Sequence, residues 1–203
     1  MNKWIIGARP RTLAAAVAPV LVATAYAGSN WEPIRALSAL LVSLSLQIGV
    51  NYANDYSDGI RGTDANRVGP LRLTGSGLVR PQAVKLAAAI TFGLAALAGL
   101  TIVLLTGQWW LVAVGAVSII AAWYYTGGKS PYGYAGLGEI AVFVFFGLIA
   151  TVGTAYIQIL AIDPMAVLLG INFGFYATAV LLVNNIRDVE TDRESGKNTL
   201  SVR

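Results

Sequence analysis

Residues 50–81 read VNYANDYSDGIRGTDANRVGPLRLTGSGLVRP, and this polar stretch holds three Asp and four Arg in a chain that is otherwise largely apolar. A second polar stretch, VNNIRDVETDRESGKNTL, occupies residues 183–200 and is again rich in Asn, Asp and Arg. Most of the remaining sequence is uncharged, so these two stretches decide where polar chemistry can take place. We predict that they meet on one side of a membrane.

The charged residues are separated by long uncharged runs. The 203 residues are 56% hydrophobic and only 12% charged, and runs of 20, 19, 43, 23 and 23 uncharged residues follow Arg11, Arg35, Lys85, Glu139 and Asp163. A helix needs about 20 apolar residues to cross a membrane. The run of 43 contains Thr106-Gly107-Gln108, which predicts a turn between two spans. The sequence therefore predicts one all-α domain over residues 1–203, a multi-spanning transmembrane bundle with six spans.

The basic residues predict how this bundle is oriented. The six spans are expected at residues 12–27, 36–53, 82–106, 109–126, 137–160 and 165–186. If the N-terminus is cytoplasmic, the segments on that side carry 13 of the 14 Lys and Arg residues, and only Arg35 lies outside them. Because basic residues collect on the cytoplasmic side, we predict a cell-membrane protein with both polar stretches in the cytoplasm. A signal peptide cleaved near Ala27 is an alternative that affects the first span only.

The chain contains no Cys and no His. This excludes disulfides, thiolate nucleophiles and imidazole acid–base catalysis. Oxygen is then the only metal ligand that the side chains offer, which favours Mg²⁺, Mn²⁺ or Ca²⁺. The net charge of +4 is explained by membrane topology, and we expect no nucleic-acid partner.

Acidic and amide side chains recur at helical spacing in both polar stretches. Asn54 and Asp58 are four residues apart, as are Asp188 and Asp192, and such pairs share one face of a continuous helix. Carboxylates from two facing helices repel each other unless a cation lies between them, and Mg²⁺ suits oxygen ligands. The sequence predicts a Mg²⁺ site with the candidate ligands Asn54, Asp55, Asp58, Asp64, Asp188 and Asp192.

Basic residues accompany the acidic ones. A metal-bound diphosphate is commonly completed by Arg or Lys, and we expect this role for Arg67, Arg72, Lys129 and Lys197. The alternative is that both stretches are ordinary polar loops whose Lys and Arg serve only topology. That alternative explains the basic residues, but it does not explain seven acidic residues in the two stretches.

The two stretches resemble the paired Asp-rich motifs of the UbiA superfamily of intramembrane prenyltransferases. The matching segments are NDYSD at residues 54–58 with GTD at 62–64, and DVETD at 188–192 with GKNTL at 196–200. Within the superfamily, RPRTL at residues 9–13 and NNIRD at 184–188 most resemble the 1,4-dihydroxy-2-naphthoate polyprenyltransferases of menaquinone biosynthesis. Tyr125 and Lys129 also match the YxxxK element of the family. Members have about nine helices, so we expect that the last three are missing from this chain.

The resemblance implies a Mg²⁺-dependent reaction in which a polyprenyl group passes from polyprenyl diphosphate to 1,4-dihydroxy-2-naphthoate. Diphosphate and CO₂ would be released and demethylmenaquinol formed. It implies catalytic roles for Asp58, Asp188 and Asp192, and Tyr125 would shield the allylic cation with its ring.

Three other functions stay open from the sequence. A sibling prenyltransferase would use another ring, such as 4-hydroxybenzoate or homogentisate. A CDP-alcohol phosphotransferase would share Asp55-Tyr-Ser-Asp58-Gly59, but it would have Ala-Arg where this chain has Gly62-Thr63. A divalent-cation transporter would carry its acidic residues within the spans, whereas nearly all of them here lie at one predicted surface.

Overall fold

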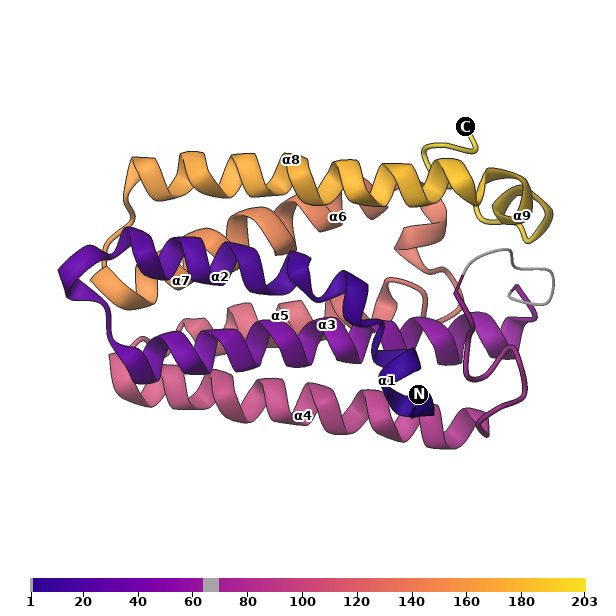
Figure 1. Ribbon diagram of the computed structural model, residues 1–203, viewed down its shortest axis with the longest axis horizontal. Helices are drawn as coiled ribbons and strands as arrows, with labels where there is room; N and C mark the ends of the chain where they lie inside the picture. Colours follow the sequence, from indigo (N-terminus) through magenta and orange to yellow (C-terminus); the bar gives the residue numbers. More distant parts are fainter. Residues whose placement is uncertain (1, 64–69) are drawn as a thin grey trace.

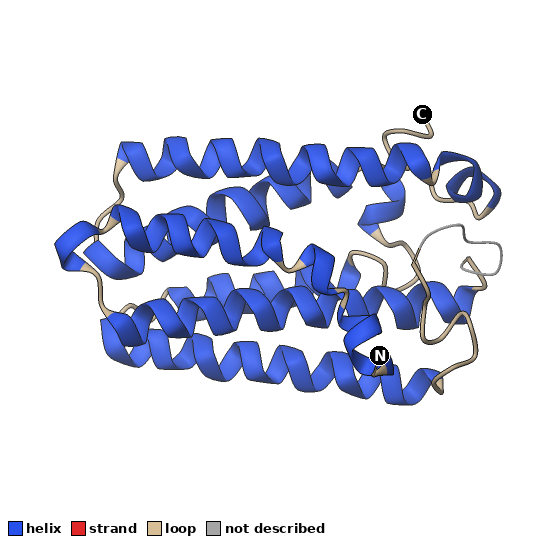
Figure 2. Ribbon diagram, viewed as in Figure 1, coloured by secondary structure: helices blue, strands red, loops and turns tan. Residues whose placement is uncertain are grey.

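The computed structural model describes residues 2–63 and 70–203, and helices make up its regular structure (Figures 1 and 2). No β-strand occurs in these ranges, so the all-α prediction is confirmed. The helices are α1 (Lys3–Ala8), α2 (Ala14–Tyr26), α3 (Pro33–Arg61), α4 (Pro81–Thr106), α5 (Leu111–Tyr124), α6 (Gly138–Val142), α7 (Ala150–Ile159), α8 (Pro164–Arg187) and α9 (Val189–Glu194). Shorter helical segments are η1 (Pro10–Thr12), η2 (Gly28–Asn30), η3 (Tyr132–Ala135) and the π-helical η4 (Phe143–Ile149).

The described part of the chain contains four helices that are long and apolar enough to cross a membrane. They cover Pro33–Arg61, Pro81–Thr106, Gly138–Ile159 and Pro164–Arg187, and a fifth is added if the bent pair Lys3–Thr12 and Ala14–Tyr26 counts as one span. The protein is therefore a multi-pass membrane protein, and four of the six predicted spans, or five with the bent pair, meet this test of length and composition. The helix expected at residues 109–126 is α5, whose 14 residues extend about 21 Å and fall short of a membrane core of about 30 Å. This remaining span still joins the two ends of the bundle, because Thr126, just after α5, donates a hydrogen bond to Asn54.

Local sequence explains both departures from the six-span prediction. In the first span, Arg9 has a left-handed backbone (φ 53°) and Pro10 follows it, so the helix is interrupted between α1 and η1. The piece Lys3–Thr12 then meets Ala14–Tyr26 at 53°. At α5, Trp109 and Trp110 lie in the preceding turn, and Gly128 (φ 76°) lies in the turn that follows the helix. Glycine readily adopts such positive φ values, so the chain turns soon after Tyr124.

Helix α3 lies at the centre of the bundle and packs against α1, α2, α4, α5 and α7. Figure 1 shows α3 and α4 running side by side, while α8 lies along η4 and α7. The contact between η4 and α8 depends on glycine, because a Cβ atom on Gly147 would lie only 2.4 Å from the Cα atom of Gly174. Small residues allow helices in lipid to approach this closely.

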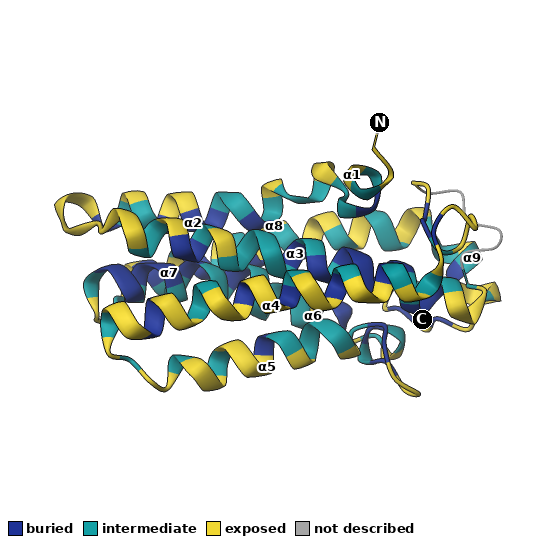
Figure 3. Cartoon of the chain, turned by 90° about the horizontal axis from the view of Figure 1, so that it is seen from below, coloured by how far each residue is buried: buried dark blue, intermediate teal, exposed yellow. Residues whose placement is uncertain are grey.

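The distribution of buried and exposed side chains is typical of a membrane protein. A buried cluster at the end of the bundle that carries the first polar stretch joins α3 and α4 to the segment between them through Tyr52, Leu73, Val79, Val84 and Phe92. Large apolar side chains on the outer faces of α4 and α5, such as Leu97 and Ile120, are exposed (Figure 3). Exposed apolar side chains are suited to contact with lipid.

The opposite end of the bundle is closed by hydrogen bonds between neighbouring helices. The Tyr26 hydroxyl donates to Asp163 Oδ1 at 2.6 Å, which ties α2 to the start of α8. The backbone N–H of Glu32 donates to Gln158 Oε1 at 2.7 Å, and Arg35 donates to the Ile157 carbonyl at 3.1 Å. These bonds satisfy polar groups at helix ends.

Candidate active site

Both polar stretches face one cavity of about 460 Å³. One part of its wall is polar and includes Asn54, Asp58, Arg72, Asp188, Asp192 and Lys197. Another part is apolar and includes Val42, Ile102, Val114, Phe145, Phe146 and Ile149. Residues about 130 positions apart in the sequence are therefore brought to the same space, as the sequence predicted.

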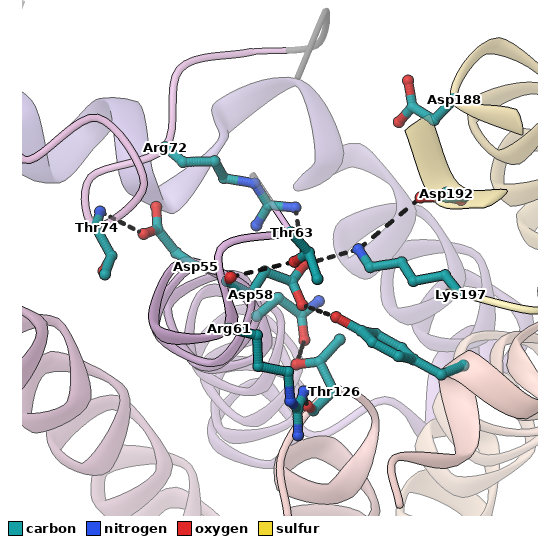
Figure 4. Close-up of polar contacts among 12 residues, drawn as sticks. Asp55, Asp58, Arg61, Thr63, Arg72, Thr74, Thr126, Asp188, Asp192 and Lys197 are labelled. Carbon is teal, nitrogen blue, oxygen red and sulfur yellow. Dashed lines mark hydrogen bonds and ion pairs between the residues drawn. The ribbon is translucent and has the colours of Figure 1, made fainter. Parts of the chain in front are cut away.

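Asp58 is a buried carboxylate in this wall and is bonded to several other segments of the chain (Figure 4). It is 1% exposed, and its Oδ1 accepts a hydrogen bond from the Tyr134 hydroxyl at 2.7 Å. Its Oδ2 accepts from Lys197 Nζ at 3.1 Å and pairs with Arg72 Nη2 at 3.5 Å. A buried carboxylate is stable only when it is paired and hydrogen-bonded, and here the partners come from three other segments of the chain.

Asn54 lies one turn before Asp58 on α3, so the prediction that the two share a helix is confirmed. Its Oδ1 accepts a hydrogen bond from the Thr126 hydroxyl at 2.7 Å. Arg61, at the end of the same helix, donates to the backbone carbonyls of Thr126 and Gly128. The turn that follows α5 is therefore fixed to the end of α3.

Asp55 has a different position from the one expected of a metal ligand. It is fully buried, and its two oxygens accept hydrogen bonds from the backbone N–H groups of Leu73 and Thr74, both at 2.7 Å. It is absent from the cavity wall. Asp55 thus holds the segment before α4 against α3, and its carboxylate is occupied by that task.

The second polar stretch is not the continuous helix that the sequence suggested. Helix α8 ends at Arg187 and α9 begins at Val189, so Asp188 lies at a break between them. Asp188 forms an ion pair with Arg187 at 2.7 Å, and Asp192 Oδ1 lies 3.9 Å from Lys197 Nζ. Asp188 and Asp192 nevertheless line the same cavity, and Figure 4 shows them opposite Asp58 with Lys197 between.

Two tyrosines near Asp58 are kept protonated by their surroundings. Burial, together with the nearby Asp58 carboxylate, raises the pKa of Tyr134 above its usual value. Burial likewise raises the pKa of Tyr125, which lies in the cavity wall as expected. The Tyr125 ring packs edge-on against Tyr132, with the ring centroids 5.5 Å apart. Both phenols can therefore act as hydrogen-bond donors.

The remaining predicted residues divide into three groups. Asp64 and Arg67 lie outside the described residues. Lys129 is exposed and absent from the cavity wall, so the geometry does not bring it to the other candidates. Arg72 and Lys197, by contrast, are both buried beside Asp58.

Sequence reasoning missed Tyr134, Thr126 and Arg61. Tyr134 and Thr126 donate to the predicted site residues Asp58 and Asn54, and Arg61 holds Thr126 through its backbone carbonyl. No recurring spacing marks any of the three. The one available signal was position, because Thr126 follows Tyr125 directly and Tyr134 lies in the short polar segment between two apolar runs.

The side chains in the polar wall suit Mg²⁺ in their chemistry. Asn54, Asp58, Asp188 and Asp192 all present oxygen, the ligand that Mg²⁺ prefers, and they reach one cavity from two sides. Over residues 2–63 and 70–203, no three acidic side chains are gathered closely enough to hold an ion as they are placed. The lysine and arginine beside Asp58 balance its charge in this arrangement.

Comparison with known proteins places this chain beside prenyltransferases. The sequence model described as the UbiA prenyltransferase family matches residues 16–203. A 1,4-dihydroxy-2-naphthoate octaprenyltransferase of Mycobacterium tuberculosis is 53% identical over 203 residues, which cover 99% of this chain and 69% of that protein. The enzyme of the same name from Escherichia coli is 44% identical over 98% of this chain and 68% of its own length. A UbiA prenyltransferase domain-containing protein 1 of Dictyostelium discoideum is 29% identical over 97% of this chain and 62% of its own length.

Proposed function

Because the chain belongs to the UbiA prenyltransferase family, we propose that it transfers a polyprenyl group from polyprenyl diphosphate to 1,4-dihydroxy-2-naphthoate. The products would be demethylmenaquinol, diphosphate and CO₂, a step of menaquinone biosynthesis. The observation that carries this proposal is the cavity, whose wall is charged in one part and apolar in another. The substrate has the same division, with a charged diphosphate and a long apolar chain.

The polar wall is suited to hold the diphosphate. Lys197 and Arg72 are the basic side chains beside Asp58, and they would bind phosphate oxygens by charge-assisted hydrogen bonds. Asn54, Asp58, Asp188 and Asp192 would hold Mg²⁺ on the same side. The chemistry that Mg²⁺ supplies when bound is Lewis-acid neutralisation of the diphosphate as it leaves.

The apolar wall is suited to the reacting carbon chain. Breaking the bond between the allylic carbon and the diphosphate oxygen sends the electron pair to diphosphate and leaves an allylic cation. Tyr125 can face this cation with its ring, and the apolar wall excludes water that would otherwise capture it. A ring carbon of the acceptor forms the new bond, and loss of the carboxylate as CO₂ returns its electron pair to the ring.

Orientation in the membrane is part of the proposal. Thirteen of 14 Lys and Arg residues fall on the side of the two polar stretches, which favours a cytoplasmic position for the N-terminus and for the polar end of the cavity. Both water-soluble groups, the diphosphate and the naphthoate carboxylate, would then reach the cavity from the cytoplasm.

The test uses purified protein in detergent with radiolabelled polyprenyl diphosphate, 1,4-dihydroxy-2-naphthoate and Mg²⁺. We expect a prenylated naphthoquinol that forms only when Mg²⁺ is present. A parallel reaction with 4-hydroxybenzoate distinguishes a sibling enzyme, which would prenylate that ring instead. If neither acceptor is prenylated and inorganic diphosphate fails to bind, the proposal is wrong.

A further inference from the structure

We propose that Tyr134 is a positioning residue that holds Lys197 against Asp58 and thereby joins the two polar stretches into one site. The inference rests on the proposed function, because it concerns how that site binds diphosphate. Tyr134 belongs to η3, between α5 and α6, and so to neither stretch. The residue spacing in the sequence did not identify Tyr134 as a site residue.

Three groups form a closed triangle at the centre of this arrangement. The Tyr134 hydroxyl donates to Asp58 Oδ1 at 2.7 Å, and Lys197 Nζ donates to Asp58 Oδ2 at 3.1 Å. Lys197 Nζ also lies 5.0 Å from the centroid of the Tyr134 ring, within the range of a cation–π contact. The Tyr134 hydroxyl and the Lys197 ammonium therefore bond different oxygens of the Asp58 carboxylate. Each bond helps to hold the carboxylate in the orientation that the other bond requires.

The backbone of η3 holds the same segment that carries Lys197. The N–H of Asn198 donates to the Tyr134 carbonyl at 3.0 Å, and Arg203 Nη2 donates to the Ala135 carbonyl at 3.1 Å. Gly136 has φ 73°, and a Cβ atom there would lie 3.4 Å from the Asn198 carbonyl oxygen. Residues 196–203 thus lie directly on η3, and the Tyr134 side chain extends this contact to Asp58.

The other side of the site reaches the same ring. Arg61, at the end of α3, places its guanidinium carbon 5.3 Å from the ring centroid of Tyr134. Arg61 belongs to the first polar stretch, three residues after Asp58, and Lys197 belongs to the second, five residues after Asp192. The ring is therefore in contact with one cation from each polar stretch, which a residue that merely fills space would not need.

Two substitutions separate the hydroxyl from the ring. Tyr134→Phe removes the hydrogen bond to Asp58 and keeps the ring, whereas Tyr134→Leu removes both. The control is Tyr132→Phe in the same η3 segment, whose hydroxyl donates to the Ala121 carbonyl at 2.9 Å. Because a hydrogen bond to a charged group is involved, we expect Tyr134→Phe to weaken calorimetric binding of inorganic diphosphate about tenfold. Tyr134→Leu should weaken it more, and Tyr132→Phe should leave it unchanged.

A labelling experiment reports position directly and needs no turnover. The chain has no cysteine, so Thr199→Cys introduces a single thiol in the segment held by η3. Thr199 is 7% exposed, and its hydroxyl has no hydrogen-bond partner among the described residues, so a thiol of similar size should fit. We expect slow maleimide labelling of this thiol and labelling about tenfold faster when Tyr134→Phe or Lys197→Met is added.

The outcomes separate the inference from the proposed function. Weaker diphosphate binding together with faster labelling supports the positioning role, even if the protein prenylates neither acceptor. Unchanged labelling in Tyr134→Phe overturns it, whether or not diphosphate binding falls, because the segment would then be held without the phenol. Equal effects of Tyr132→Phe and Tyr134→Phe would also overturn it, since loss of any nearby hydroxyl would then suffice.

Discussion

Asp163 and Asp58 lie near opposite ends of the bundle, and the two carboxylates are used in opposite ways. Asp163 caps its own helix by accepting from the N–H groups of Met165 and Ala166, and it accepts one further bond from Tyr26. Asp58 is bonded to Tyr134, Lys197 and Arg72, from three other segments, and two of these partners are cations.

The comparison shows what distinguishes a site from a cap. The cap at Asp163 satisfies the backbone of its own helix, and its one distant partner is a neutral hydroxyl. A buried carboxylate that gathers cations from distant segments costs folding free energy to assemble, and it creates a polar surface that a charged ligand can share. Substitutions at the two ends should therefore separate activity from stability.

The largest effect is expected at Asp58. Asp58→Ala removes a candidate metal ligand together with the partner of Tyr134 and Lys197, so prenyl transfer should fall by more than about 100-fold. The matched control is Asp163→Asn, which should keep normal turnover and lower the thermal midpoint. The measurement is the rate of product formation by each variant at saturating substrate. A similar loss of activity in both variants would contradict the prediction.

Asp55 should behave as a structural residue although it lies in the same motif as Asp58. Asp55→Ala leaves the N–H groups of Leu73 and Thr74 without their acceptors, and bonds of this type to a charged group contribute about 1.5–3 kcal/mol each. We expect a lower midpoint of thermal unfolding in detergent. Asp55→Asn keeps one acceptor oxygen and should recover part of the loss, whereas a midpoint equal to that of the parent protein would show that these bonds are dispensable.

The two lysines of the predicted diphosphate site should differ. Lys197 is buried beside Asp58 and Lys129 is exposed, and an exposed charge interacts weakly with its surroundings. Lys197→Met should raise the KM for polyprenyl diphosphate about tenfold, and Lys129→Met should leave it within about twofold. Equal increases would mean that Lys129 reaches the diphosphate in the working enzyme.

The smallest effect is a pH dependence at the other end of the bundle. The Tyr26 hydroxyl, followed by the backbone N–H of Met165, lowers the pKa of Asp163 below 3.8. The folded state therefore favours the ionised carboxylate, and the resulting stability is present above the usual pKa and is lost as the pH falls through the lowered value. Thermal midpoints recorded from pH 6 downward should fall less steeply below pH 4 in Asp163→Asn than in the parent protein.

The parts of the fold that could be predicted depend on regular helices. Charge-free runs gave the helices, and the four-residue spacing of Asn54 and Asp58 gave a shared face because α3 continues through Arg61. The same reasoning failed at Asp188, where α8 ends, and at α5, which is shorter than the apolar run that predicted it. The spacing of charged and apolar residues does not report where a helix ends inside such a run.

The site residues also divide into those that the sequence could predict and those that it could not. The acidic residues and Lys197 could be selected by residue type, since a diphosphate–metal site requires those groups. The inward turn of Asp55 toward Leu73 and Thr74 could not, because its partners are backbone groups that every residue carries. Tyr134 could not either, since its contact with Asp58 spans 76 positions and follows no period.

The division of the cavity between a charged and an apolar wall has a consequence for kinetics in a bilayer. A substrate whose long chain is dissolved in lipid arrives by two-dimensional diffusion, while its partner and the released diphosphate exchange with water. We therefore expect the rate to follow the mole fraction of polyprenyl diphosphate in the membrane rather than its bulk concentration. Diluting a fixed amount of that substrate with inert lipid should slow the reaction, although no concentration in the aqueous phase has changed.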